Sequence, residues 1–105
     1  MATLNQCLSM LSRHIGQGNG IGAKTLAQQL DTPERNVRMM ISELRNEGYA
    51  ICGTPSSGYY IAATPDELEQ TCAFLRHRAM HSLRMESRLR KISLPDLLGQ
   101  LHVPT

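Results

Sequence analysis

Apolar residues recur every three to four positions through most of this 105-residue chain, a spacing that predicts amphipathic helices. The first predicted helix covers residues 4–15, with Thr3 as its N-cap. A glycine-rich stretch ends this helix, and a shorter helix of about two turns follows within residues 21–31. A third helix is expected over residues 33–47. Its buried stripe should consist of Val37, Met40, Ile41 and Leu44.

The pattern changes after Gly48, where two short runs with alternating side chains flank the tip sequence TPSSG. This change predicts a β-hairpin with strands at residues 49–53 and 58–62. Two strands alone are marginally stable in water, so the hairpin should lie on the helices. A very short third strand around residues 20–21 can pair with the edge of the hairpin.

A long helix is expected after the hairpin, over residues 64–92, because its acidic first turn is typical of a helix N-terminus. Such a helix is about 40 Å long, more than a small three-helix core can cover. Its apolar spacing is close to a heptad repeat, which Ser82 and Glu86 weaken. The predicted dimerisation residues are Leu68, Cys72, Leu75, Ala79, Leu83 and Leu89. A second copy of the chain is the preferred partner, and a different protein or solvent alone are the alternatives.

These elements predict a mainly α-helical fold with a small β-hairpin, in the α+β class. The chain divides into a helix–hairpin domain at residues 1–63, a long dimerisation helix at residues 64–92 and a short leucine-rich tail at residues 93–105. The tail carries apolar side chains that need cover. It can cross onto a partner subunit or act as a docking motif for a second protein.

The segment IGAKTLAQQLDTPERNVRMMISELRNEGYAICGTPSSGYYIA joins two predicted helices to the hairpin through short connections. It resembles the winged helix-turn-helix domain of the biotin-repressor-like group. The matching motifs are the second helix TLAQQL, the recognition helix TPERNVRMMISELRNEGY and the strand–wing–strand AICGTPSSGYYI. The resemblance covers residues 4–63 and implies a winged helix-turn-helix fold that binds DNA. The long helix after the wing resembles that of small phage and prophage proteins.

The resemblance implies DNA contacts from both helices and from the wing tip, and the residue types there fit this role. Arginine can fork onto guanine or phosphate, asparagine can pair with adenine, and serine can contact either base or phosphate. The expected contacts are Thr25, Gln28, Arg35, Asn36, Arg38, Met39, Ser42, Arg45, Ser56 and Ser57. The alternative is that Arg35 and Arg38 only solvate the helix and pair with Glu34 or Asp31. The wing tip departs from many members of the group because it carries no Arg or Lys.

The net charge of +2 is too small to identify a nucleic-acid partner, but the charge is unevenly distributed. Residues 76–91 hold six Arg or Lys against one Glu, a net of +5. We therefore expect a sequence-specific protein that binds double-stranded DNA and regulates transcription as a homodimer. The alternative is a winged-helix adaptor that binds proteins, such as a phage replication or assembly factor or an inhibitor of a host factor. The leucine-rich tail and the uncharged wing tip favour this alternative.

The remaining candidate chemistry is sparse. His77 and His81 are four residues apart on a helix, a spacing that can bind a metal, but no third ligand accompanies them. No histidine lies near a cysteine or a carboxylate cluster at a spacing typical of nucleophilic catalysis, so no enzyme activity is expected. A metal site and a cofactor are not expected either. Three widely spaced cysteines fit plain thiols in a reducing cytoplasm. No apolar run is long enough to span a membrane.

Overall fold

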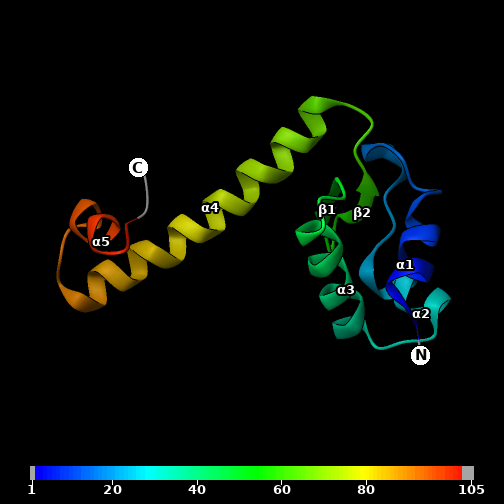
Figure 1. The fold of residues 1–105 in the computed structure, drawn as a ribbon, viewed down its shortest axis with the longest axis horizontal. Helices are drawn as coiled ribbons and strands as arrows, with labels where there is room; N and C mark the ends of the chain where they lie inside the picture. The colour runs from blue at the N-terminus through cyan, green and yellow to red at the C-terminus, as the bar shows by residue number, and fades with distance from the viewer. Residues whose placement is uncertain (1, 103–105) are drawn as a thin grey trace. The chain divides into compact units, whose positions relative to one another are not determined.

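A computed structural model describes residues 2–102 (Figure 1). The chain divides into two units, Met1–Thr71 and Cys72–Thr105. The first unit contains α1 (Leu4–Leu11), the 3₁₀ turn η1 (Gln17–Asn19), α2 (Ala23–Leu30), α3 (Glu34–Asn46), β1 (Ile51–Thr54) and β2 (Gly58–Ile61). Helix α4 (Pro65–Arg90) begins in the first unit, and the second unit ends with α5 (Leu94–Gln100). The predicted fold class is confirmed, since the protein is mainly helical with one two-stranded hairpin and a long C-terminal helix.

Helices α1, α2 and α3 enclose the core of the first unit. Helix α1 begins at a capping box, in which the side chains of Thr3 and Gln6 each accept a hydrogen bond from the other's backbone N–H. The predicted stripe of α3 is confirmed, because its four residues are all buried. The core cluster consists of Cys7, Leu11, Ile21, Ala23, Leu26, Ala27, Val37, Met40, Ile41, Leu44, Ile51 and Tyr59. A tight turn joins α2 to α3, and Asp31 enters it with a left-handed backbone (φ 51°).

Helix α1 is shorter than its apolar spacing predicts. It ends at Leu11, so the prediction that it reaches Ile15 is wrong, and Ile15 is 51% exposed. The chain beyond the helix runs beside β2 instead. There the Ile61 N–H donates to the His14 carbonyl at 2.8 Å, and the Gly16 N–H donates to the Ile61 carbonyl at 2.9 Å. These hydrogen bonds to the edge of the hairpin replace the helical bonds of the expected last turn.

The hairpin is antiparallel, with Gly53 opposite Tyr59 and Thr54 opposite Gly58, and it depends on two glycines that approach each other closely near its tip. Gly53 (φ 89°) and Gly58 (φ 102°) both have left-handed backbones. A Cβ atom at Gly53 would overlap the carbonyl oxygen of Gly58, so only glycine fits there. Ile21 pairs with Tyr59 through backbone hydrogen bonds of 2.9 and 2.8 Å. The predicted third strand is therefore reduced to one bridge at the hairpin edge.

The first turns of α4 are fastened to the first unit by Glu67. Its carboxylate accepts hydrogen bonds from the backbone N–H groups of Ala63 at 2.8 Å and Gln17 at 3.0 Å. Both bonds stabilise the charged form and lower the pKa of the Glu67 carboxyl. One turn later, the Thr71 hydroxyl accepts a hydrogen bond from the Gly53 N–H at 3.1 Å. The first two turns of α4 therefore belong to the first compact unit, which ends at Thr71.

The second unit holds the rest of α4 together with α5 (Figure 1). Ser93 caps α5, and its hydroxyl accepts a hydrogen bond from a backbone N–H of the first turn at 3.2 Å. Leu97 and Leu98 of α5 are buried, as is Ser87 of α4. The end of the predicted tail, residues 103–105, lies outside the described residues. Every helix in the described part of the chain is too short or too polar to cross a membrane.

Candidate nucleic-acid interface

The outward side of α3 is the leading candidate surface. Successive helix residues are separated by about 100°, so residues three or four apart share a side of the helix. Arg35, Arg38, Met39 and Ser42 lie opposite the buried stripe, and all four are exposed, with Met39 at 59%. We call these four residues the α3 face. The face combines two guanidinium groups, a hydroxyl and a thioether, and all four residues are predicted DNA contacts.

The two arginines of the α3 face are not neutralised by nearby carboxylates. Within residues 2–102, no Asp or Glu lies at ion-pair distance from Arg35 or Arg38. The structure therefore shows no pairing of these arginines with Glu34 or Asp31, and the alternative that they only solvate the helix stays a prediction. Glu34 and Glu43 instead flank the face on opposite sides of the helix, where they reduce its net positive charge.

Arg45 is also a predicted DNA contact, and in the structure its side chain contacts the hairpin. Its Nε and one terminal nitrogen donate to the carbonyl oxygens of Ile51 at 2.7 Å and Gly53 at 3.0 Å. The guanidinium carbon also lies 5.9 Å from the centre of the Tyr59 ring. Burial raises the pKa of the Tyr59 hydroxyl, and the positive charges of Arg45 and Arg38 oppose this rise. Arg45 therefore braces the hairpin against α3.

Side-chain hydrogen bonds within the protein also involve three other predicted contacts, Asn36, Ser56 and Ser57. The Asn36 amide donates to the Thr32 hydroxyl at 3.1 Å, on the flank of α3. At the wing tip, the Thr54 and Ser57 hydroxyls lie 2.7 Å apart, and each accepts a hydrogen bond from the other's backbone N–H at 3.0 Å. This reciprocal pair closes the tip. Ser56 remains exposed beside it.

The wing tip folds back onto the start of α2. The Ala23 N–H donates to the Pro55 carbonyl at 3.1 Å, and an open hollow lies beside this contact. Its polar lining consists of Lys24 from α2, Glu34 and Arg38 from α3, and Ser56 from the wing. Three separate segments thus bring polar groups together next to the α3 face. Sequence reasoning missed Lys24, although its place in the first turn of the second predicted helix was a usable signal.

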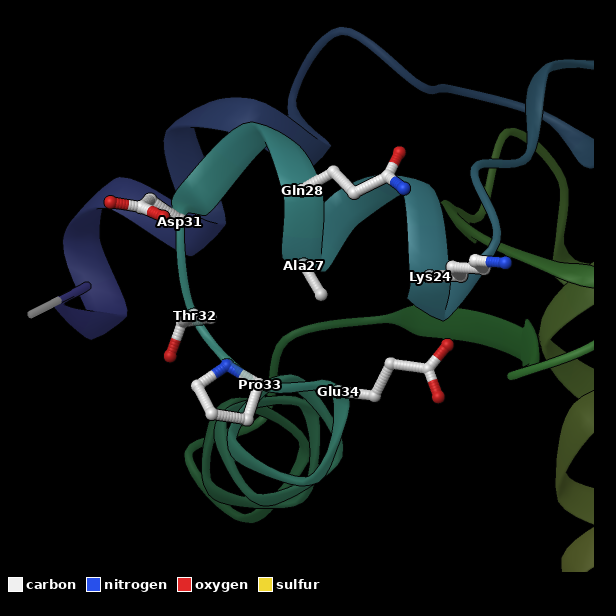
Figure 2. A pocket seen from close by; sticks show the side chains of 7 residues that line it. All are labelled: Lys24, Ala27, Gln28, Asp31, Thr32, Pro33 and Glu34. Atoms are coloured by element: carbon white, nitrogen blue, oxygen red, sulfur yellow. The ribbon is translucent and has the colours of Figure 1, made fainter.

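A second open hollow lies between α2 and α3 (Figure 2). Lys24 and Gln28 reach it from α2, and both side chains are exposed. Asp31 and Glu34 also line it, so its charge is mixed. Thr25 is exposed on α2 but lines neither hollow. Polar side chains that can hold phosphate groups therefore follow α2 beside the α3 face.

The predicted dimerisation residues of α4 are accessible. Leu68 and Leu75 are each 41% exposed, and Leu89 is 82% exposed. Cys72 and Ala79 are also exposed, whereas Leu83 is half-buried. A helix with apolar residues at this spacing and exposure has a face that a partner can cover.

Metal-binding groups of three or more His, Cys, Asp or Glu residues are absent from the described part of the chain. Comparison of the chain with family models, with curated proteins and with solved structures finds no match.

Proposed function

We propose that this protein binds double-stranded DNA in a sequence-specific manner and regulates transcription as a cytoplasmic homodimer. The observation that carries the proposal is the α3 face, whose arginines are exposed opposite a fully buried stripe and have no carboxylate partner within residues 2–102. The tight turn from α2 and the hairpin behind α3 support the same interpretation, because a helix that enters a groove must be braced. The resemblance to winged helix-turn-helix domains and small phage proteins is consistent with this function.

In the proposed complex, α3 lies in the major groove, which is about 12 Å wide and admits one helix. Arg35 and Arg38 donate paired hydrogen bonds to guanine edges or to phosphates. Ser42 bonds to a base or a phosphate, and Met39 packs against a thymine methyl group. These contacts supply the sequence preference, because base edges carry the information that distinguishes one site from another.

Phosphate contacts in the proposal come from the residues around the two hollows. Lys24 and Gln28 on α2 and Ser56 on the wing are exposed and flank the α3 face. Thr25 can add a further contact from α2. Arg45, Asn36 and Ser57 act indirectly in this scheme, because their side chains hold the hairpin, the turn and the wing tip in shape.

The DNA-binding proposal is tested by selecting bound sequences from a random duplex pool and measuring the affinity of variants for the selected site. We expect Arg38→Ala to weaken binding by about 1–3 kcal/mol and to relax the preference at one position. Arg13→Ala is the matched control, because Arg13 is exposed but lies on the chain after α1, away from the α3 face. A pool that yields no preferred sequence, or equal losses for both variants, would contradict the proposal.

The homodimer is proposed to form through the apolar stripe of α4. Leu75 lies within this stripe and Ala73 lies on another side of the helix, and both residues are exposed. We expect sedimentation of the full chain to give a dimer, Leu75→Glu to give a monomer and Ala73→Glu to remain dimeric. If Leu75→Glu sediments as the unchanged protein does, the α4 stripe is not the dimer contact.

A protein-binding adaptor is the second candidate, and the wing favours it. The tip between β1 and β2 carries no Arg or Lys, and it folds back onto α2. Phosphate neutralisation supplies most of the affinity of a DNA-binding protein, so few contacts from the tip mean weak binding. The adaptor function predicts negligible binding to duplex DNA even at low salt, where the regulator binds strongly.

A further inference from the structure

One side of α4 carries a row of basic side chains that the proposed α3 contacts do not use. His77, His81, Arg84, Arg88 and Lys91 follow one another at intervals of four, three, four and three residues. This spacing places the first four on one side of the helix. Lys91 follows directly after the last helical residue, with a left-handed backbone (φ 57°). All five are exposed. We call them the basic stripe, and its helical members span about 16 Å along the axis.

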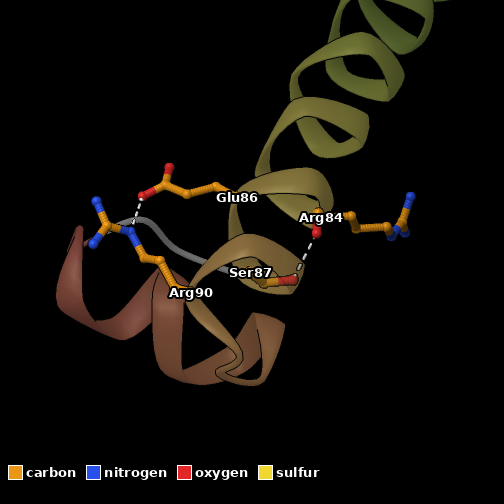
Figure 3. A network of polar contacts seen from close by, with 4 residues as sticks. All are labelled: Arg84, Glu86, Ser87 and Arg90. Carbon is orange, nitrogen blue, oxygen red and sulfur yellow. Dashed lines mark hydrogen bonds and ion pairs between the residues drawn. The ribbon is translucent and has the colours of Figure 1, made fainter.

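The charge of the basic stripe is not neutralised within the described residues. The ion pair of this region joins the Arg90 Nε to the Glu86 carboxylate at 2.7 Å (Figure 3). Glu86 lies about 200° around the helix from Arg84, on the opposite side. Figure 3 accordingly shows the Arg84 side chain pointing away from this pair. Among residues 2–102, Asp96 of α5 is exposed and forms no ion pair with the stripe.

Solvation of the helix does not by itself account for this arrangement. Like charges three or four residues apart repel and destabilise a helix, whereas the pairing of Glu86 with Arg90 stabilises it. The helix dipole favours cations near the C-terminus, which explains Arg88. It does not explain Arg84, which lies before the last turn.

We infer that the basic stripe binds the phosphate backbone of double-stranded DNA and supplies sequence-independent affinity. This inference rests on the proposed function. A duplex offers negative charges at regular, short intervals along its axis, and the stripe offers one basic group for each helical turn or less. Arginine binds phosphate with two parallel hydrogen bonds. No Leu, Ile, Met or aromatic residue interrupts the stripe, whereas the centre of a protein–protein interface is apolar.

The basic stripe also adds positive charge that the DNA-contacting surface of the first unit lacks. The wing tip contributes no cation, and Glu34 and Glu43 flank the α3 face. Few phosphate contacts are therefore available around α3. A second, non-selective contact raises total affinity without altering which sequence is read, because phosphate contacts position a protein and base contacts specify the site.

The test measures binding of the full chain to a random-sequence duplex of about 20 base pairs, over roughly 50–200 mM salt. The double variant Arg84→Gln, Arg88→Gln removes two charges from the stripe. The matched control Arg76→Gln, Arg78→Gln removes two exposed charges from other sides of α4. The slope of log affinity against log salt should fall in magnitude by about 2 in the stripe variant and by less than about 0.5 in the control. Arg84→Lys, Arg88→Lys keeps the charge and should retain most of the slope.

Several outcomes would overturn the inference. An unchanged slope in the stripe variant would do so, and so would equal losses in both glutamine variants, which would indicate net charge alone. The Arg35→Ala, Arg38→Ala variant separates this inference from the proposed function. If that variant loses the preference for the selected site while the stripe variant keeps its slope, the stripe fails and the proposed function stands. If sequence preference never depends on α3 but the stripe variant loses slope, the proposed function fails and the stripe stands as a general DNA contact.

Discussion

The two units of this protein differ in how their helices cover their apolar sides. In the first unit, the apolar sides of α1, α2 and α3 close on one cluster with the hairpin, and Leu26 and Val37 have no exposed surface. The second unit buries Leu97 and Leu98 of α5. It leaves large apolar side chains exposed at Phe74, Leu75, Met85, Leu89 and Leu101.

The difference shows that one kind of sequence pattern can have two meanings. Apolar spacing of three to four residues predicts a side of a helix that avoids water, but it does not identify what covers that side. In α3 the protein's own core covers it. In α4, most of the apolar side beyond Thr71 is exposed to solvent. A partner can cover this side.

Truncation of one apolar side chain in each unit should give the largest difference in the free energy of unfolding. Ile41 is 1% exposed and Leu89 is 82% exposed. We expect Ile41→Ala to lower the free energy of unfolding by about 2–5 kcal/mol, because it leaves a cavity in the core. Leu89→Ala should change it by no more than about 0.5 kcal/mol in the monomer. Urea unfolding at low protein concentration measures both, and equal costs would contradict the comparison.

Replacing a glycine by alanine should lower the stability of the protein in the first unit and raise it in the second. Gly53→Ala forces a Cβ into the carbonyl of Gly58 at a left-handed backbone, so we expect a loss of about 1–3 kcal/mol from strain, with the overlap adding to it. Gly99 lies in α5, and the space that an added methyl group would occupy there is open. Gly99→Ala should stabilise α5 by about 0.5–1 kcal/mol. Thermal unfolding followed by circular dichroism compares them, and a neutral Gly53→Ala would show that the hairpin tolerates other geometries.

Arg45 and Arg35 test whether arginines of one helix divide into bracing and binding residues. Arg45→Met removes two charged hydrogen bonds to the hairpin, and we expect a loss of about 1–3 kcal/mol of stability. Arg35→Met removes an exposed side chain and should stay within about 0.5 kcal/mol. Chemical unfolding measures the stability of both variants. For DNA affinity we expect the reverse order, with the larger loss in Arg35→Met, because Arg35 is the proposed direct contact. A stable Arg45→Met protein would mean that the hairpin does not need this brace.

The smallest effect concerns the attachment of α4 and depends on pH. Hydrogen bonds lower the pKa of the folded Glu67 carboxyl below its ordinary value of 4.5, so its charged form stabilises the fold at neutral pH. This contribution is lost as the pH falls below about 4.5 and approaches the lower folded-state pKa. Glu67→Gln should therefore be less stable than the unchanged protein at pH 7, and the difference should shrink in acid. Glu69→Gln, which alters an exposed carboxylate of the same turn, should show no such trend.

Much of the candidate site follows from residue spacing. The buried stripe of α3 leaves Arg35, Arg38, Met39 and Ser42 on its outer side, and this separation needs only the geometry of a helix. Arg45 shows the limit of that reasoning. It lies near the same side by spacing, but its long side chain reaches carbonyl groups six and eight residues further along the chain.

The sequence by itself determined the helices, the hairpin and their order, because helix caps, apolar spacing and turn residues act between near neighbours in the chain. Only the tertiary structure decided where α1 stops, how the wing folds back onto α2 and which polar side chains remain available. The first two depend on hydrogen bonds between segments far apart in sequence, such as the bond from Ile61 to His14. The third depends on where the side chains point once helix and hairpin are packed together, as Arg45 shows. Local spacing carries no information about such partners, since they meet only when the chain has folded.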